Sequence, residues 1–421
     1  MEQTLAMVLA GGKGKRMDVL CQERPKPILP FGGRFRVIDF SLSNCVHSDI
    51  GEIAVLSNYQ RSRISGYLRD WYLNNAGCIS LSILEPKPGF SYLGTADAIY
   101  QNLDYLESSD ADTVLILAAD HIYKMDYRKM LDFHRDAGAD VTLGVVEVPI
   151  EDGYRFGIVE TDSKNRIVDY VEKPENPRNN LASMGIYVFD KEALIYRIME
   201  YGISRPSKHD LTYTVVPEVL KHDKFYAYRF NGYWRDIGNV NAFYEANMEI
   251  INLQKHFKTD GKWPVLTGVN GNDQSAEPDN CDVTNSVIGP GCLIKGHVEN
   301  SILSPGVIVD ENAIVKDSVL MPEVSVGYHS VIEGCILDEK VNVGKFSYIG
   351  FGNDSPLENE NITILGKGAV VPSGTAIGSN CKLMPYVCPE DIDSPVIASG
   401  SVIYCNSGTG EDRVQELTEV K

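Results

Sequence analysis

The residues best suited to chemistry in this 421-residue chain form a glycine-rich loop near its start. An apolar run ends at Leu9 and Ala10, and Gly11, Gly12 and Gly14 follow. Glycines let backbone N–H groups approach a phosphate closely, and a helix beginning after the loop adds the positive end of its dipole. The stretch therefore predicts a polyphosphate-binding strand–loop–helix unit, although an ordinary strand-to-helix turn is the simpler alternative.

Two basic side chains close behind the loop suit the same ligand. Arg16 can grip phosphate oxygens with two hydrogen bonds, and Lys26 brings a mobile point charge. The loop is not a Walker A motif, because no Gly-Lys-Ser/Thr follows, and it lacks the third glycine of the dinucleotide fingerprint. We therefore assign both cations to polyphosphate binding by a loop of another kind.

Isolated charged residues mark the ends of later strands. Asp120 follows the apolar run 113–118, which is typical of a central parallel strand. Ligands gather outside the carboxyl ends of such strands, and Mg²⁺ often takes one or two carboxylates plus substrate phosphates. Asp120 is thus a predicted Mg²⁺ ligand, with a helix N-cap as the alternative. Asp236 is a second isolated carboxylate. Lys173 ends a predicted strand, and the simplest interpretation of a lysine there is a solvated surface side chain.

The elements that must position these residues alternate between strand and helix up to about residue 250. This alternation predicts an α/β domain with a Rossmann-like, mixed but mostly parallel sheet. Residues 156–159 and 167–174 predict a hairpin, residues 95–106 predict a helix with Thr95 as its N-cap, and residues 239–252 predict a long amphipathic helix. The predicted strands are the runs 5–10, 53–57, 79–84, 113–118, 141–148 and 183–189.

After residue 280 the apolar spacing lengthens to about six residues. Aliphatic pairs recur with Gly, Pro or Asn at the corners, which suits neither a helix nor a simple strand. A repeat of this length predicts a parallel β-helix, with a β-sandwich as the alternative. The expected organisation is an α/β domain at 1–252, a linker at 253–280, a β-helix at 281–405 and a disordered polar tail at 406–421.

Composition narrows the class of protein. The net charge is −19, yet the first forty residues carry seven basic and four acidic side chains, which favours a small anionic ligand over nucleic acid. The nine cysteines form no Cys-x-x-Cys pair, which favours a reducing compartment. With neither a signal pattern nor an apolar run of about 20 residues, the sequence predicts a cytoplasmic protein without membrane association.

Eight stretches, in order, resemble the ADP-glucose pyrophosphorylases (glucose-1-phosphate adenylyltransferases) of the sugar-nucleotide pyrophosphorylase family. The repeat domain is also similar to the left-handed β-helix of that family. The matching stretches are LAGGKGKR (9–16), KPILPFGG (26–33), FRVIDFSLSNC (35–45), YLGTADAIYQN (92–102), DHIYKMDY (120–127), VEKP (171–174), ASMGIYVF (182–189) and YWRDIG (233–238).

The resemblance implies transfer of an adenylyl group from ATP to α-D-glucose 1-phosphate, giving ADP-glucose and pyrophosphate for glycogen or α-glucan synthesis. It also implies Mg²⁺ held by Asp120 and Asp236. The implied roles are nucleotide binding for Leu9, Ala10, Gly11, Gly12 and Gly14, catalysis for Arg16, Lys26, Asp120, Lys173 and Asp236, and glucose 1-phosphate binding for Tyr92, Gly157, Glu172, Lys173 and Ser183.

The resemblance further implies an anionic effector at Arg34 and Arg36, for which ion pairing with Asp39 is the alternative, and assembly as a homotetramer or a heterotetramer with a homologous subunit. Lys15 replaces the threonine usual in the family, and the segment 209–214 lacks its usual lysine and second acid. Three other functions stay open. They are a pyrophosphorylase using UTP, dTTP or GTP, a non-catalytic regulatory subunit, and an acyltransferase with His297 or His329 as general base.

Overall fold

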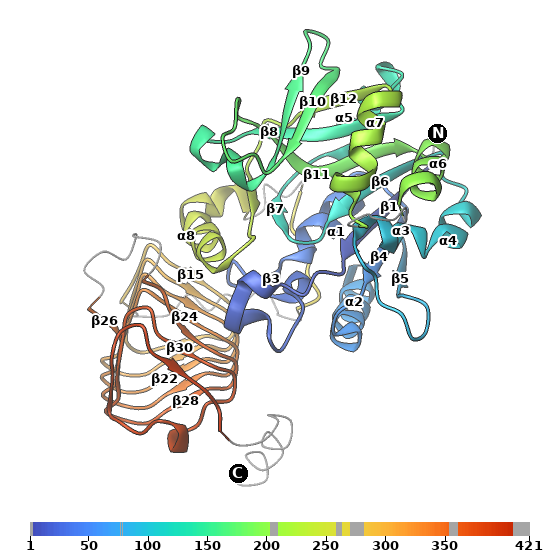
Figure 1. The fold of residues 1–421 in the computed structure, drawn as a ribbon. Coiled ribbons are helices and arrows are strands. Elements are labelled where there is room, and N and C mark those ends of the chain that lie inside the picture. Colours follow the sequence, from blue (N-terminus) through green and yellow to red (C-terminus); the bar gives the residue numbers. More distant parts are fainter. Residues whose placement is uncertain are drawn as a thin grey trace. The chain divides into compact units, whose positions relative to one another are not determined.

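The computed structural model describes residues 3–75, 77, 79–202, 209–257, 263–269, 282–352 and 361–406. The chain divides into two compact units, whose elements are labelled in Figure 1. The first unit comprises residues up to Gly12 and Ile38–Asp236, and the second comprises Lys13–Val37 and the chain from Ile237 onward. The chain therefore leaves the first unit within the glycine-rich loop and returns to it at Ile38.

The first unit is built on a nine-stranded mixed sheet. Its strand order is β10-β9-β11-β6-β1-β4-β5, and β8 pairs with both β11 and β12. Only β10 and β11 run against the other strands of this sheet, so the predicted mixed, mostly parallel sheet is confirmed. The strands are β1 (Thr4–Ala10), β4 (Glu52–Ser57), β5 (Ser80–Leu84), β6 (Thr113–Ala118), β8 (Val141–Glu147), β9 (Gly157–Thr161), β10 (Ile167–Glu172), β11 (Leu181–Asp190) and β12 (Phe225–Arg229).

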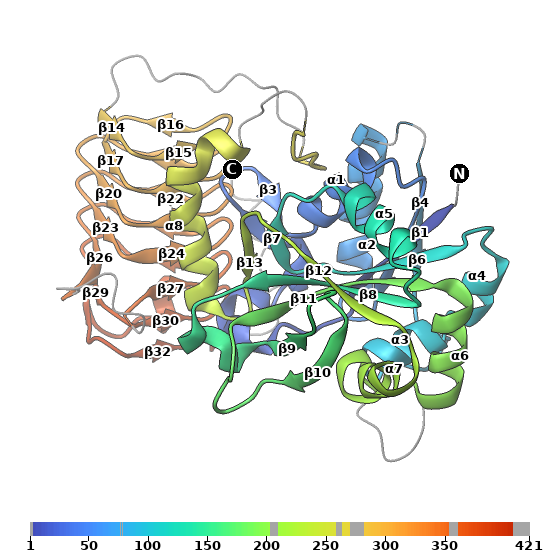
Figure 2. The same cartoon turned by 90° about the horizontal axis from the view of Figure 1, so that it is seen from above.

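Helices cover both faces of this sheet. α3, α6 and α7 lie over one face, and α1 and α5 lie over the other (Figure 2). Fully buried side chains such as Met7, Ile116 and Leu194 join strands and helices in one apolar core. The helices are α1 (Ile38–His47), α2 (Arg61–Asn75), α3 (Thr95–Tyr100), α4 (Leu103–Ser108), α5 (Tyr127–Asp136), α6 (Lys191–Tyr201) and α7 (Val216–His222).

The single helix predicted over 95–106 is wrong. The structure has two short helices, α3 and α4, and the residue that precedes α3 is Gly94. The Thr95 hydroxyl does not cap α3, because it accepts a hydrogen bond from the Leu211 N–H at 2.7 Å. The first amides of α3 donate instead to the carbonyl oxygen of His209, so a distant segment caps this helix.

The second unit contains α8 (Val240–Phe257) and three parallel sheets. Each sheet takes one strand from successive coils of the chain, which confirms the predicted left-handed β-helix. The first sheet contains β14 (Asp282–Thr284), β17 (His297–Glu299), β20 (Ile314–Lys316), β23 (Val331–Glu333), β26 (Tyr348–Phe351), β29 (Ala376–Gly378) and β31 (Val396–Ile397). The second contains β15 (Val287–Ile288), β18 (Ile302–Leu303), β21 (Val319–Leu320), β24 (Cys335–Leu337), β27 (Thr363–Leu365), β30 (Lys382–Leu383) and β32 (Val402–Ile403). The third contains β16 (Leu293–Ile294), β19 (Ile308–Val309), β22 (Ser325–Val326), β25 (Asn342–Val343) and β28 (Val370–Val371).

The six-residue spacing places one aliphatic side chain per face inside each coil. Leu303, Leu320 and Leu337 occupy the same position in successive coils and are fully buried. Serines recur at one corner because their hydroxyls satisfy backbone amides of the next coil, as Ser301 does for the N–H of Ser318 at 3.1 Å. Each coil thus supplies apolar packing and corner hydrogen bonds to its neighbour.

Residues 13–37 also belong to the second unit and form short elements. These are the 3₁₀ turns η1 (Lys15–Cys21) and η2 (Lys26–Ile28), followed by the paired strands β2 (Pro30–Phe31) and β3 (Phe35–Arg36). The regular helix predicted after the glycine-rich loop is wrong. Asp18 has φ 51° and ψ −124° inside η1, which breaks the helical path, and its carboxylate pairs with Lys382 of the β-helix.

Much of the predicted linker (253–280) and nearly all of the predicted tail (406–421) lie outside the described residues, so their boundaries stay predictions. Within the described part of the chain, no helix has the length and apolar character needed to cross a membrane.

Candidate active site

The carboxyl ends of β1, β4 and β6 lie side by side in the first unit. Leu9 of β1 pairs with Leu56 of β4 on one side and with Ala118 of β6 on the other. The residues that follow these strands therefore gather at one edge of the sheet, which is where α/β proteins bind ligands. They include Gly11, Asn58 and Asp120.

The approach of Gly11 to its neighbour leaves little space for a side chain. A Cβ atom at Gly11 would lie 3.3 Å from Cβ of Asn58 and 3.8 Å from the ring of Tyr92. Asn58 also holds the Tyr92 backbone through two hydrogen bonds, and Asn102 donates to the Tyr92 hydroxyl at 2.8 Å. Tyr92 is therefore fixed beside the glycine-rich loop, and burial raises the pKa of its phenol, so the hydroxyl stays protonated.

Asp120 and Asp236 flank one imidazole, that of His121. β7 (His121–Tyr123) pairs with β13 (Trp234–Asp236) in an antiparallel ladder that sets Asp236 opposite His121. Nε2 of His121 lies 3.6 Å from Oδ1 of Asp120 and 3.8 Å from Oδ1 of Asp236. Two carboxylates that are distant in sequence are thus brought together just beyond the carboxyl end of β6.

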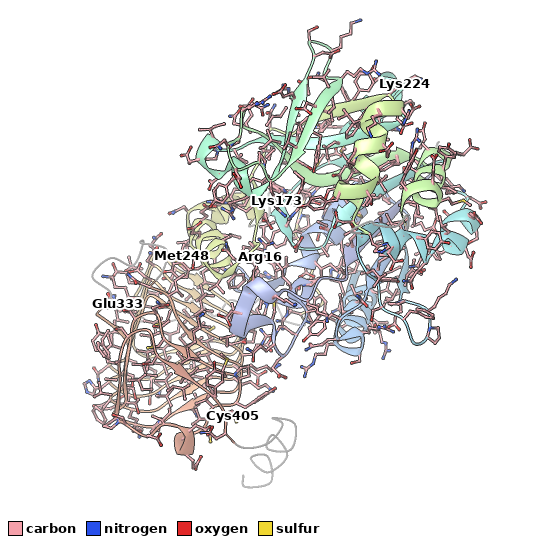
Figure 3. The ribbon with its side chains drawn as sticks, viewed as in Figure 1. Arg16, Lys173, Lys224, Met248, Glu333 and Cys405 are labelled. Atoms are coloured by element: carbon pink, nitrogen blue, oxygen red, sulfur yellow. The ribbon has the colours of Figure 1, made fainter. Side chains whose placement is uncertain are left out.

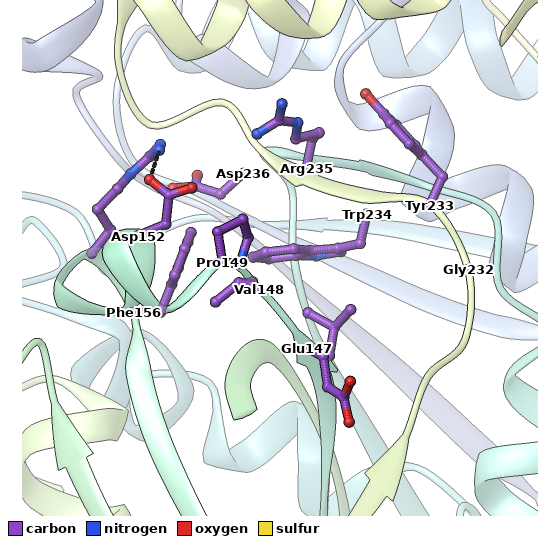
Figure 4. A pocket seen from close by; sticks show the side chains of 12 residues that line it. Glu147, Val148, Pro149, Asp152, Phe156, Gly232, Tyr233, Trp234, Arg235 and Asp236 are labelled. Atoms are coloured by element: carbon purple, nitrogen blue, oxygen red, sulfur yellow. Dashed lines mark ion pairs between the residues drawn. The ribbon is translucent and has the colours of Figure 1, made fainter. Parts of the chain in front are cut away.

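An aromatic wall continues from this cluster. His121 packs edge-on against Trp234 at 5.1 Å between ring centroids, and Trp234 packs in the same way against Phe156 at 5.5 Å. A cavity of about 300 Å³ opens beside this wall (Figure 4). Asp236 lines it, as do an ion pair between Arg155 and Asp152 and the side chain of Arg235. Charged groups of both signs therefore surround an aromatic floor next to the two carboxylates.

Glu172, Gly157 and Ser183 lie on three adjacent strands. Glu172 of β10 pairs with Gly157 of β9, and the register of β9 with β11 places Ser183 next to Gly157. The Ser183 hydroxyl accepts a hydrogen bond from the N–H of Gly185 at 3.2 Å, and Gly185 faces the His121 ring. The predicted sugar-binding residues of the sheet thus form a row that leads toward the carboxylate pair.

Gly157 leaves room for a hydrogen bond that the sequence did not reveal. The Tyr170 hydroxyl donates to Oε2 of Glu172 at 2.6 Å, and burial raises the pKa of Tyr170 far above its usual value, so the phenol remains a donor. A Cβ atom at Gly157 would lie 2.2 Å from the Tyr170 hydroxyl and 2.8 Å from Glu172 Oε2. Glycine is therefore required for this pair to keep its geometry.

We expect Gly157→Ala to displace the Tyr170–Glu172 pair and to raise the KM for a sugar phosphate by roughly tenfold, as loss of one hydrogen bond to a charged group does. Steady-state kinetics with each substrate varied in turn would measure this. Gly89→Ala is a control, because Gly89 also lies in the first unit but has no atom within 4 Å of the position that a Cβ would take. Gly89 has a positive φ, so the comparison is made at equal thermal stability. An unchanged KM for the sugar phosphate in folded Gly157→Ala protein would contradict the assignment.

Lys173 adopts a backbone conformation that lysine rarely takes. It follows β10 with φ 51°, its N–H donates to the Phe156 carbonyl at 3.0 Å, and its ammonium lies 3.4 Å from Oε1 of Glu172. Figure 3 labels this side chain at the end of the hairpin strand. About half of the side-chain surface is exposed, so the charge is available to an anion. A strained backbone at such a position is typical of functional residues.

Arg16 and Lys26 lie in the second unit with Gly14. Arg16 is exposed, whereas Lys26 is only 7% exposed. Gly14 has φ +62°, and a Cβ atom there would lie 3.0 Å from the Cys21 sulfur and 3.4 Å from Cβ of Lys26. Burial raises the pKa of the Cys21 thiol to about 12 against the opposing charges of Arg24 and Lys26. Lys26 therefore stands beside a neutral thiol and the last loop glycine.

The predicted effector residues differ in their surroundings. Arg34 is exposed, and its guanidinium lies 5.7 Å from the centre of the Phe35 ring. Arg36 pairs with a carboxylate of the β-helix, because its Nη1 lies 2.7 Å from Oε1 of Glu339. Asp39 is fully buried and accepts a hydrogen bond from the Tyr67 hydroxyl at 2.5 Å.

The divergent segment at 209–214 has a structural role of its own. Asp210 caps the π-helical turn η4 (Leu211–Val215), because its carboxylate accepts from the N–H of Thr212 at 3.0 Å and from its hydroxyl at 2.6 Å. The carbonyl of His209, which has φ 53°, accepts from the first amides of α3. Threonine hydroxyls and backbone atoms thus order this segment without the lysine and second acid that the family usually has.

Two histidines of the β-helix were candidates for acyl transfer. Nδ1 of His297 lies 2.8 Å from Oδ2 of Asp282, and Nε2 lies 3.7 Å from Glu299. His329 stacks on Phe346 at 5.7 Å and contacts Tyr328 edge-on at 4.2 Å. Each imidazole thus has neighbours that account for its position in a coil.

The donor set at Asp120 and Asp236 suits a hard divalent cation. Among the described residues, no group of three or more His, Cys, Asp or Glu side chains could hold a metal ion. Two carboxylates alone are enough for Mg²⁺, which usually completes its shell with water and substrate phosphates. His121 Nδ1 is buried and has no hydrogen-bond partner among the described residues, so the carboxylate cluster also contains an unsatisfied polar atom.

His121, Trp234, Phe156 and Tyr170 are the site residues that sequence reasoning missed. His121 follows Asp120 in the sequence, and Trp234 lies two residues before Asp236. Their closeness in sequence to predicted metal ligands was the only sign that they belong to the site. Tyr170 and Phe156 carried none, because their positions depend on how the hairpin of β9 and β10 folds back.

Comparison with known proteins gives a consistent result. Residues 5–252 match the nucleotidyl transferase family, and residues 272–371 match the GlmU-like C-terminal hexapeptide family. The chain is 42% identical to the glucose-1-phosphate adenylyltransferase of Pseudothermotoga lettingae and 43% identical to that of Thermotoga maritima, over 96% of this chain and 99% of each relative. It is 38% identical to the enzyme of the same name from Acetivibrio thermocellus, over 96% of this chain and 98% of that relative.

Proposed function

Because the chain belongs to the glucose-1-phosphate adenylyltransferase family of nucleotidyl transferases, we propose that it transfers the adenylyl group of ATP to α-D-glucose 1-phosphate. The products are ADP-glucose and pyrophosphate, and the proposed pathway is glycogen or α-glucan synthesis. The observation that carries the proposal is the pair Asp120 and Asp236 around His121, at the carboxyl edge of the sheet where the glycine-rich loop begins.

The nucleotide is assigned to the loop of Leu9, Ala10, Gly11, Gly12 and Gly14, and its triphosphate to Arg16 and Lys26. The packing at Gly11 and Gly14 supports this assignment, because only glycine lets the loop backbone lie so close to Asn58 and to Cys21, and a phosphate-binding loop needs this backbone freedom. Tyr92, which the family resemblance assigns to the sugar, stands beside Gly11, so we propose that it orients the nucleotide as well.

The sugar phosphate is assigned to Lys173, Glu172, Gly157 and Ser183. The ammonium of Lys173 binds the phosphate, and the Glu172 carboxylate, held by Tyr170, accepts hydrogen bonds from sugar hydroxyls. The phosphate oxygen of the sugar then attacks the α-phosphorus of ATP in line with the departing pyrophosphate. No protein nucleophile is required, because both reacting groups belong to the substrates.

Asp120 and Asp236 are the proposed Mg²⁺ ligands, and the bound ion would neutralise charge that develops on the reacting phosphates. The side chains of the protein hold the reacting phosphates in position. Arg16 and Lys26 hold the leaving pyrophosphate, and Lys173 holds the attacking phosphate.

A matrix of nucleotides against sugar phosphates, with and without Mg²⁺, tests this function on the purified chain. We expect pyrophosphate release to be fastest with ATP, glucose 1-phosphate and Mg²⁺ together. Equal or faster release with UTP, dTTP or GTP would replace the adenylyl assignment by another pyrophosphorylase activity. A chain that releases nothing alone but activates a co-expressed homologue would instead be a regulatory subunit.

We also propose an anionic effector and a tetrameric assembly, as a homotetramer or with a homologous subunit. The exposed Arg34 supports the effector, whereas Arg36 is already paired with Glu339. Light scattering, and activity measured across a series of sugar phosphates and adenylates, test these two points.

A further inference from the structure

The segment 13–37 is fastened to the β-helix by buried ions. Arg24 is 2% exposed, and its Nη2 lies 2.6 Å from Oδ1 of Asp338 and 3.4 Å from Oε2 of Glu339. Glu339 also receives Arg36 at 2.7 Å and Lys367 at 3.0 Å. Two adjacent carboxylates after β24 therefore hold two arginines of the segment and one lysine of the β-helix itself.

The two carboxylates of this cluster respond differently to their surroundings. Burial alone would raise the pKa of Glu339, but the neighbouring Arg24, Arg36 and Lys367 hold it well below its usual range. Burial raises the pKa of Asp338, and the charge of Arg24 opposes this. Breaking such a buried pair on one side only would leave an uncompensated charge, whereas replacing both partners by apolar groups is often tolerated.

Two further contacts fasten the same segment at other points. The Lys382 ammonium pairs with Asp18, the residue that takes the strained φ of 51° inside η1. The Tyr386 hydroxyl donates to Oε2 of Glu23 at 3.2 Å. The β-helix thus contacts the segment through side chains of successive coils, near its beginning, middle and end.

Each proposed triphosphate cation lies two residues from one of these anchors. Arg16 precedes Asp18, and Lys26 follows Arg24. Lys26 also packs against Gly14, so the position of the Lys26 side chain is fixed relative to the end of the glycine-rich loop. An anchor that shifts would shift the neighbouring cation with it.

We propose that Asp338, Glu339 and Lys382 of the β-helix are positioning residues for the pyrophosphate-bearing end of the nucleotide. They act through Arg24 and Asp18, which set the backbone that carries Lys26 and Arg16. The β-helix therefore sets the geometry of both proposed triphosphate cations. This inference rests on the proposed function, because it assigns its effect to the triphosphate side of that reaction.

The decisive experiment compares Lys382→Met and the double variant Arg24→Met/Asp338→Leu with wild type. The first variant breaks a pair whose side chains are about one-third exposed, and the second replaces both partners of a buried pair, so both variants are expected to fold. In each variant, displacement of Arg16 or Lys26 should cost a charge-assisted contact with the triphosphate, so the KM for ATP should rise roughly tenfold or more. The KM for glucose 1-phosphate should stay within about twofold of the wild-type value, because neither variant removes a contact to the sugar phosphate.

Glu323→Gln is the matched control. Glu323 is an exposed carboxylate of the same β-helix, 3.8 Å from the exposed ammonium of Lys340. Its kinetics should equal those of wild type. Lys382→Arg should restore the KM for ATP, since it keeps a charge for Asp18, and this rescue is not expected from a general loss of stability.

Calorimetric binding of inorganic pyrophosphate separates this inference from the function on which it rests. Anchor variants should bind pyrophosphate roughly tenfold more weakly than wild type, whether or not turnover is observed. A wild-type chain that binds pyrophosphate but does not release it from ATP would overturn the proposed function alone. Unchanged pyrophosphate affinity in the folded variants, equal rises in both KM values, or no pyrophosphate binding by wild type would overturn the positioning role.

Discussion

Replacing Asp120 by asparagine is expected to lower kcat by roughly three orders of magnitude, in the range seen when a main electrostatic contributor to catalysis is removed. The amide keeps the shape of the carboxylate but loses the charge that a divalent cation requires. The Asp120 side chain is 37% exposed beyond the carboxyl end of β6, so the substitution removes no core packing. The unfolding temperature should therefore match that of wild type, as measured by calorimetry.

A control variant and a double variant complete the test of Asp120. Asp104→Asn changes an exposed acid at the start of α4 and should leave kcat unchanged. If Asp120 and Asp236 hold one cation, the double Asn variant should be scarcely slower than either single variant, because residues that act as a unit are not additive. A near-normal rate in Asp120→Asn would refute the metal role.

Replacing Lys173 by glutamine is expected to raise the KM for glucose 1-phosphate roughly 10- to 100-fold, since a hydrogen bond between ionised groups contributes about 1.5–3 kcal/mol. Glutamine has similar length and keeps a donor, but it carries no charge to meet a phosphate. The KM for ATP should change little, because Lys173 contacts Glu172 at the end of β10 and not the glycine-rich loop residues. Initial rates with each substrate varied in turn give both values.

Lys173 has two useful comparison variants. Lys164→Gln removes an exposed lysine from the turn of the same hairpin and should alter neither KM. Lys173→Gly relieves the positive φ of 51°, so it should leave the fold at least as stable while losing the sugar phosphate. Equal effects of Lys173→Gln on both substrates would contradict the assignment to one phosphate.

Sequence patterns predicted the parts of the fold that depend on local periodicity. The aliphatic pairs after residue 280 fix the coils of the β-helix, because each inward position must be apolar whichever coil it belongs to. The run 113–118 likewise predicts a central strand, and the position of Asp120 just after that strand made it a predicted ligand-binding residue. The ordered motifs predicted the family, which the comparisons confirm.

The features that escaped prediction depend on distant partners. Asp236 lies beside Asp120 only because β13 pairs with β7, and nothing near either strand specifies that register. The helix expected after the glycine-rich loop fails at Asp18, whose partner Lys382 is far away in sequence. Arg36 pairs with Glu339, which lies 303 residues further along the chain. Local patterns carry no information about such pairings.

The buried anchor at Arg24 also has a consequence for synthesis of the chain on the ribosome. Its partner Asp338 lies 314 residues further on, so the segment 13–37 is made long before the coil that neutralises it. At about 5–20 residues per second, this delay is roughly 15–60 s. During that time the cations of the segment 13–37 lack the carboxylates of the β-helix with which they pair in the folded chain. Anchoring of this segment therefore waits until Asp338 and Glu339 have been synthesised.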